Sequence, residues 1–133
     1  VGTLSLRAVA ALMPYAQDVV VAGHDRDEIG LLMFPTPALR KLANDETGTM
    51  SGEQMAAHPE VRALLSAALA ELNAGQGSSG RAARAVILSA PPDLGQGETT
   101  DKGYTNQRMV LSLRAHEVQR LFGDDASVIF PGT

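Results

Sequence analysis

Two apolar segments on either side of a short polar turn most constrain what this chain can fold into. Residues 18–23 (Asp-Val-Val-Val-Ala-Gly) are rich in β-branched side chains, and residues 29–34 (Ile-Gly-Leu-Leu-Met-Phe) form a second run of strand length before Pro35. Because only the polar turn 24–28 lies between them, the two predicted strands can pair as a hairpin. Neither run alternates apolar with polar residues, which predicts a sheet covered on both faces, at least partly by helices.

The segments that flank this hairpin have helical spacing. Residues 3–16 predict a helix that ends near Met13, because the next residue is a proline. Thr36 followed by Pro37 is a typical helix start, with a capping hydroxyl and then proline at the first helical position. That second helix is expected to run to about Ala43.

Two more helix starts follow in the middle of the chain. Ser51 and Gln54 have the spacing of a capping box, which predicts a short helix to about Ala57. His58-Pro59 begins a longer helix. The apolar stripe expected to face the sheet consists of Val61, Leu64, Leu65, Ala68 and Leu72.

The last third of the chain adds one strand and one helix to the prediction. Residues 84–89 predict a third strand, and residues 106–122 predict a single helix that Gly123 ends. Residues 124–133 are expected to form a loosely held tail. The predicted buried face of this helix consists of Leu111, Ala115, Val118 and Phe122.

The order of these elements predicts the fold class. Helix, strand, strand, helices, strand, loop and helix are typical of a small α+β domain with a three-stranded sheet and flanking helices. A chain of 133 residues is long enough for one domain with its own core, so residues 1–133 are expected to form a single domain.

Composition excludes several classes of function. The net charge of −4 argues against a nucleic-acid partner, which would select a basic surface. The absence of cysteine excludes disulfides and Cys-based metal sites and is compatible with the cytoplasm, the expected location. No window approaches the roughly 20 apolar residues of a membrane span. The three histidines stand far apart, and the acidic turn 24–28 lacks the glutamate that would complete a calcium loop, so no metal site is assigned.

One loop carries the candidate chemistry. Residues 97–108 (Gly-Glu-Thr-Thr-Asp-Lys-Gly-Tyr-Thr-Asn-Gln-Arg) join the third strand to the last helix. A flexible Gly- and Thr-rich loop with one lysine, Lys102, can present that lysine to an anion. Asp-Lys-Gly is also a common turn sequence, in which the lysine would only be exposed to solvent. The residues by themselves reveal no nucleophile, acid–base pair or phosphate loop.

Three segments resemble features of one known family. Residues 2–5 (Gly-Thr-Leu-Ser) are similar to its glycine-containing segment just after an interdomain hinge, and residues 19–32 to its paired strands with an Asp-containing turn. Residues 85–88, followed by Pro91-Pro92, are similar to the strand before its lysine loop. On these features, which cover nearly the whole chain, the sequence resembles the C-terminal domain of the adenylate-forming superfamily: acyl-CoA synthetases, peptide-synthetase adenylation domains and luciferases.

Two motifs resemble one branch of that superfamily. Residues 23–30 and 100–108 are similar to the feruloyl-CoA synthetases. In one respect the chain departs from the wider pattern, in which the catalytic lysine follows glycine as Thr-x-x-Gly-Lys. Here Lys102 precedes Gly103, and Tyr104 occupies the usual lysine position. A shift of the loop by one residue would bring Lys102 to the same place.

The resemblance implies a two-step acid–thiol ligase. ATP and a carboxylic acid, ferulate or a related hydroxycinnamate, would give an acyl-adenylate, with Mg²⁺ accompanying the ATP, and CoA would then displace AMP. Lys102 would be the catalytic lysine of the first step, with Thr100 and Gly103 supporting its loop. Gly2 would lie on the face that serves CoA in the second step.

The same resemblance makes this chain a C-terminal lid domain. Its partner would be a large N-terminal adenylation domain of the same protein, absent from these 133 residues. The first residue is Val1, so we expect a processed or cut fragment that is inactive alone and binds none of these ligands. Two alternatives stay open: a free-standing regulatory or binding module without catalysis, and the lid of an adenylation domain that serves a carrier protein.

Overall fold

A computed structural model describes most of the chain. The described residues are 2–13, 15–23, 29–45, 48–74, 82–89, 95, 97–99, 105–123 and 127–131, with residues 2–6 described by their backbone alone. The elements are α1 (Gly2–Leu12), β1 (Ala16–Ala22), β2 (Ile29–Pro35), α2 (Pro37–Leu42), α3 (Gly52–Ala57), α4 (Pro59–Asn73), β3 (Ala82–Ile87), α5 (Gln107–Leu113) and α6 (Ala115–Leu121).

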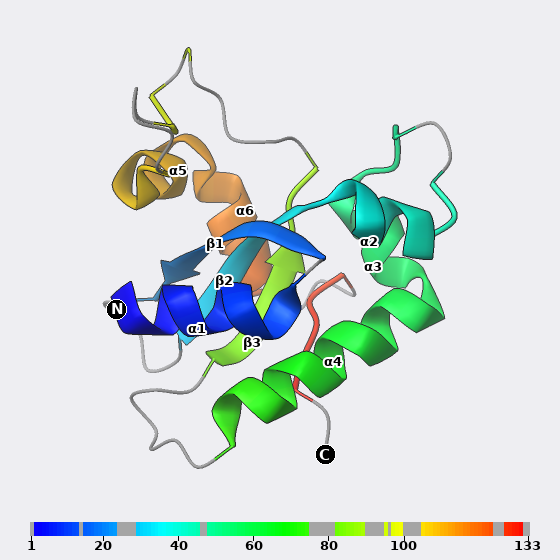
Figure 1. Cartoon of the computed structure of the whole chain (residues 1–133). Helices are drawn as coiled ribbons and strands as arrows, with labels where there is room; N and C mark the ends of the chain where they lie inside the picture. Colours follow the sequence, from blue (N-terminus) through cyan, green and yellow to red (C-terminus); the bar gives the residue numbers. More distant parts are fainter. Residues whose placement is uncertain are drawn as a thin grey trace.

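The described strands form one three-stranded sheet in the order β1-β2-β3. β1 and β2 pair antiparallel with Val20 opposite Leu32, and β3 joins β2 in parallel with Val86 opposite Leu32. The predicted hairpin and the α+β class are therefore confirmed. Figure 1 shows α1 crossing one face of the sheet while α6 lies behind it.

Alternate strand residues face two separate apolar cores, as the strand period of two requires. Val19, Leu31 and Ile87 belong to one core, which we call the thick-side core because α1, α2, α3 and α4 all contribute to it. Val20, Leu32 and Val86 belong to the other, which we call the thin-side core because, among the described residues, only α5, α6 and Val128 complete it. The predicted cover on both faces is confirmed.

Three helices begin at the caps that the sequence predicts. The Thr36 hydroxyl accepts the Leu39 N–H at 3.3 Å at the start of α2. Ser51 and Gln54 form the capping box of α3, with reciprocal bonds of 3.1 and 2.9 Å. His58 caps α4 through Nδ1, 3.3 Å from the Glu60 nitrogen. These local hydrogen bonds fix where each helix starts.

The buried face of α4 differs from the predicted stripe by about one position. Its buried residues include Leu69, which the stripe lacks, whereas Leu64 and Ala68 are only partly buried at the margin of the core. The spacing selected a helical face correctly but placed its centre too close to Leu64. The fully buried apolar residues of this face are Val61, Leu65, Leu69 and Leu72.

The single helix predicted over residues 106–122 is wrong, because two helices occupy this segment. α5 ends and α6 begins at Arg114, whose φ of −112° and ψ of 37° are not helical. The predicted face is correct only in part: Leu111, Val118 and Phe122 pack partly buried against the thin-side core, but Ala115 is exposed. The fully buried residues of the two helices are Val110 and Leu121. The break allows α6 to pack closely on β2, where a Cβ added to Gly30 would lie 2.6 Å from Leu121 Cδ2.

The loosely held tail is also wrong for residues 127–131. Ile129 exchanges two backbone hydrogen bonds with Ala85, of 2.8 and 2.9 Å, and is 1 % exposed. Arg62 donates to the Val128 carbonyl at 3.0 Å, and the Ser66 hydroxyl donates to the Phe130 carbonyl at 2.6 Å. The tail therefore covers the outer edge of β3, where unpaired strand groups would otherwise remain.

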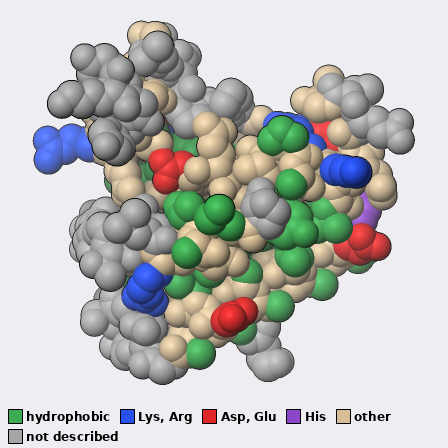
Figure 2. All heavy atoms as spheres, viewed as in Figure 1, with side chains coloured by type: hydrophobic (Ala, Val, Ile, Leu, Met, Phe, Trp, Pro, Cys, Tyr) green, Lys and Arg blue, Asp and Glu red, His purple; other side chains and the backbone are tan. Residues whose placement is uncertain are grey.

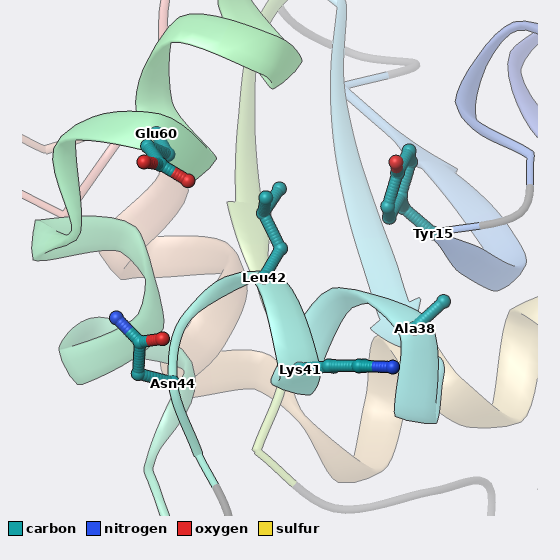
Figure 3. Close-up of a pocket in the computed structure, with 6 residues that line it drawn as sticks. All are labelled: Tyr15, Ala38, Lys41, Leu42, Asn44 and Glu60. Atoms are coloured by element: carbon teal, nitrogen blue, oxygen red, sulfur yellow. The ribbon is translucent and has the colours of Figure 1, made fainter.

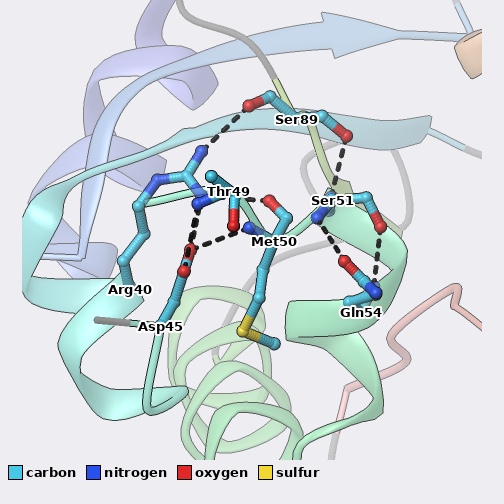
Figure 4. Close-up of polar contacts among 8 residues, drawn as sticks. Arg40, Asp45, Thr49, Met50, Ser51, Gln54 and Ser89 are labelled. Atoms are coloured by element: carbon cyan, nitrogen blue, oxygen red, sulfur yellow. Dashed lines mark hydrogen bonds and ion pairs between the residues drawn. The ribbon is translucent and has the colours of Figure 1, made fainter. Parts of the chain in front are cut away.

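A polar network ties α2 and α3 to the end of β3 (Figure 4). Arg40 donates to the Asp45 carboxylate at 2.8 Å, to the Met50 carbonyl at 3.0 Å and to the Ser89 carbonyl at 2.9 Å. Asp45 in turn accepts the backbone N–H groups of Thr49 and Met50, each at 3.1 Å. Burial acts to raise the pKa of Asp45, but the bonds from Arg40, Met50 and Thr49 outweigh it and hold the pKa below its ordinary value.

The described residues contain neither a helix that could span a membrane nor a cluster that could hold a metal ion. None of their helices is long and apolar enough to cross a membrane. They also contain no group of three His, Cys, Asp or Glu side chains that could hold a metal ion.

Candidate functional site: the base of the lysine loop

The structure describes only some of the predicted site residues. Lys102, Thr100 and Gly103 lie outside the described residues, so their roles stay predictions. Gly2 is the first residue of α1. The residues on either side of segment 100–104 are described, and they form what we call the loop base: residues 97–99, residues 105–106 and Arg114.

The backbone closes the loop base. Thr99 and Thr105 form an isolated antiparallel bridge, and the Asn106 N–H donates to the Glu98 carbonyl at 2.7 Å. Gly97 takes a φ of +83°, in the left-handed region that glycine adopts without strain. The two ends of segment 100–104 are therefore held next to each other.

A buried ion pair joins the loop base to the helices that follow it. Arg114 Nε donates to Glu98 Oε2 at 2.8 Å, and a terminal nitrogen of the same guanidinium donates to Oε1 at 2.9 Å. The side chains of Arg114 and Glu98 are 15 % and 3 % exposed. This two-point contact fixes both the distance and the orientation of the pair.

Arg114 also connects the loop base to the sheet. Its guanidinium carbon lies 4.9 Å from the centre of the Phe34 ring, which is fully buried on β2 in the thin-side core. Because Arg114 is also the residue at the break between α5 and α6, one side chain contacts the loop base and the sheet from the point where the helix changes direction.

The helix that follows the loop begins at a fixed point. The Asn106 side chain accepts the Met109 N–H at 3.2 Å as the N-cap of α5. The Gln107 side-chain oxygen accepts the Val21 N–H of β1 at 3.4 Å. Sequence reasoning included Glu98 in its loop motif but missed Arg114, because a polar residue inside a predicted helix gives no signal of a distant carboxylate partner.

The loop base and Gly2 lie on opposite faces of the sheet. α1 packs on the thick side through Ala8 and Leu12, whereas Arg114 packs on the thin side against Phe34. Within the described residues, Gly2 and the loop base therefore belong to different faces of the domain.

A shallow hollow of about 410 Å³ lies on the thick side (Figure 3). Lys41 extends toward Ala38, while Glu60 and Asn44 lie on the other side of Leu42. Figure 2 shows hydrophobic side chains between α1 and α4 on this face, with charged side chains scattered around them. Gly2, the predicted site residue that the structure describes, does not line the hollow. Its lining residues are Tyr15, Ala38, Lys41, Leu42, Asn44 and Glu60.

Solved structures with the same fold come from adenylation domains. The A-PCP didomain of carboxylic acid reductase from Segniliparus rugosus, in complex with AMP, matches with a TM-score of 0.66 and 20 % identity, over 91 % of this chain and 15 % of that one. The A domain of that reductase, in complex with AMP and a co-purified carboxylic acid, matches with a TM-score of 0.66 and 18 % identity, over 90 % of this chain and 17 % of that one. This chain thus spans less than a fifth of either.

Sequence comparison gives the family directly. No curated protein matches the chain. The sequence profile of the AMP-binding enzyme C-terminal domain, however, matches residues 5–126, which include all three strands, the loop base and both helices that follow it. The chain therefore belongs to the family of AMP-binding enzyme C-terminal domains.

Proposed function

We propose that this chain is the lid of an ATP-dependent acyl-CoA ligase that activates an aromatic acid, ferulate or a related hydroxycinnamate. In the first step the acid's carboxylate attacks the α-phosphate of ATP and pyrophosphate leaves. In the second, the thiol of CoA attacks the acyl carbonyl and AMP leaves. The large N-terminal adenylation domain of the same protein would hold most of the substrates and the Mg²⁺ that accompanies ATP.

The observation that carries this proposal is the closed loop base. Lys102 is the third residue after Thr99 and the third before Thr105, and those two threonines are bridged. A closed base lets segment 100–104 present a cation without disturbing the cores. At ~4 Å, a lysine contributes about 4 kcal/mol of attraction to an anion at an effective dielectric of ~20, before desolvation. That charge is useful where a carboxylate approaches a phosphate.

The positions of Gly2 and the loop base on opposite faces support a lid with two working positions. A domain that turns between the two steps needs one face for each. We assign the Lys102 loop to adenylation and the start of α1, at Gly2, to thioester formation.

Lys102→Ala in the complete enzyme tests the assignment. We expect adenylate formation to fall by about 10²–10³, the usual effect of losing one donor that stabilises developing negative charge. Thioester formation from supplied acyl-adenylate and CoA should stay within about twofold of wild type, because the lysine serves the first step only. The matched control is Lys41→Ala, which removes the only other lysine of the chain.

Two outcomes of this experiment contradict the assignment. Equal loss in both half-reactions places Lys102 in general binding or structure. No loss in either makes another residue the adenylation cation, and Arg108 is then the next to test.

A second candidate function is supported by the structural neighbours. One of them is an A-PCP didomain of a carboxylic acid reductase, which fits a lid that serves a carrier protein instead of CoA. The two candidate functions differ only in the second half-reaction, where the acyl group passes either to CoA or to a carrier protein. The purified enzyme with its bound acyl-adenylate is mixed with either CoA or a thiol-bearing carrier protein. Transfer of the acyl group to the carrier without transfer to CoA favours the second candidate.

A further inference from the structure

We infer that Glu98 and Arg114 are positioning residues that hold the base of the Lys102 loop closed for adenylation. This inference rests on the proposed function. The pair spans the loop: Glu98 lies just before it, and Arg114 lies beyond it at the break between α5 and α6. Glu98 also accepts the Asn106 N–H through its carbonyl, so its backbone and its side chain both hold the base closed.

The energetics of buried ion pairs separate this role from simple stabilisation. A buried pair gains little net stability over an apolar replacement, because desolvation offsets the attraction between the charges. The thin-side core has apolar residues of its own, with Val110, Leu121 and Val128 packed on Val20 and Val86. What the two-point contact of Arg114 with Glu98 adds is orientation, which a planar guanidinium provides and a lysine does not.

Orientation at the base matters for a group at the tip of the loop. The position of the Arg114 guanidinium is fixed from two directions. It lies against the Phe34 ring, and its backbone lies at the break between the two helices. Opening the base lets the tip of the loop sample more positions. A displacement of about 1 Å of a reacting group can cost on the order of 10²-fold in rate.

The chain offers a direct readout of base opening. It contains two lysines, Lys41 and Lys102, so a protease specific for lysine has two sites. A protease needs an extended segment longer than the five residues between the bridged threonines, so cleavage after Lys102 requires the base to open. Cleavage after Lys41, inside α2, requires that helix to unfold and serves as the internal reference.

The first experiment measures both cleavage rates in native buffer for wild type, Glu98→Gln and Arg114→Lys. We expect the rate after Lys102, relative to that after Lys41, to rise at least about tenfold in both variants, the factor for one lost charged hydrogen bond. The matched control is Asp45→Asn, which disrupts the buried pair of Asp45 with Arg40 next to Lys41 and should leave the absolute cleavage rate after Lys102 unchanged. An unchanged ratio in Glu98→Gln and Arg114→Lys overturns the inference.

The second experiment uses the complete enzyme and separates this inference from the proposed function. We expect Glu98→Gln to lower kcat for adenylate formation about tenfold, with little change in KM for ATP and none in thioester formation from supplied adenylate. If Lys102→Ala is inactive in adenylation but Glu98→Gln matches wild type, the inference fails and the proposed function stands. If Lys102→Ala is fully active, the assignment of Lys102 to adenylation fails and the inference fails with it.

Discussion

The two faces of the sheet are covered in different ways. On the thick side, α1, α2, α3 and α4 bury a continuous apolar core that includes the 15-residue helix α4. On the thin side, two helices of seven residues each and Val128 cover the strands. Short helices depend on tertiary contacts rather than on their own propensity, so the thin side relies on its few anchoring contacts.

Arg40–Asp45 on the thick side and Arg114–Glu98 on the thin side are both buried Arg–carboxylate pairs, and these two pairs act differently. Asp45 binds Arg40 and also accepts two N–H groups from its own loop, so its carboxylate shapes a local turn. Glu98 binds Arg114 across 16 positions of sequence and holds two segments together. The comparison fits our proposal, in which the thick side supplies stability and the thin side supports the base of the Lys102 loop.

Leu65→Ala is the largest change that tests this division. Leu65 is 1 % exposed in the thick-side core, and we expect its truncation to lower the free energy of unfolding by about 2–5 kcal/mol. The matched control is Leu64→Ala, one position away and only partly buried, where we expect less than half that loss. Chemical denaturation of both variants measures the difference. A loss below ~1 kcal/mol for Leu65→Ala contradicts the assigned core.

The sequence predicts the elements whose signals are local. The hairpin follows from two close β-branched and apolar runs, and the caps at Thr36, Ser51 and His58 depend on hydrogen bonds to residues two or three positions away. These features need no knowledge of distant partners, which is why pattern and spacing were enough.

Two features that sequence reasoning missed, the break at Arg114 and the ordered tail, depend on distant partners. The break at Arg114 is accompanied by a carboxylate 16 positions earlier, and the ordered tail depends on Ala85, 44 positions before Ile129. Of the candidate site, Glu98 lay inside the loop segment 97–108 that the sequence singles out, but its partner Arg114 did not. The assignments of Lys102, Thr100 and Gly103 come from resemblance and stay predictions.

Gly30→Ala tests how closely the thin side packs. A Cβ at Gly30 would lie 2.6 Å from Leu121 Cδ2 and 2.9 Å from its Cγ, so α6 or the leucine has to move. We expect a loss of about 1–3 kcal/mol in the free energy of unfolding, the usual cost of overpacking. The double variant Gly30→Ala/Leu121→Ala should lose less than the sum of its single variants, because the clash is relieved. Additive losses would mean that the two residues do not meet.

Asp45→Asn is expected to change the free energy of unfolding least of these variants. Its effect should depend on pH, which tests what the Asp45 charge contributes on the thick side. Its folded-state pKa is lowered by Arg40 and two backbone donors, against the raising effect of burial. The unfolded pKa is about 3.9, so the contribution of Asp45 to stability is complete above that value and is lost as pH falls through the lower folded pKa. Wild type should therefore be more stable than Asp45→Asn at pH 7, and the two should converge as pH falls below about 4.

Unfolding by denaturant at pH 7, 5, 4 and 3 measures the difference in stability between the two proteins, in which the contributions of the other carboxyl groups cancel. A difference that stays constant across this range would mean that the Asp45 charge contributes nothing and that only the shape of its turn matters.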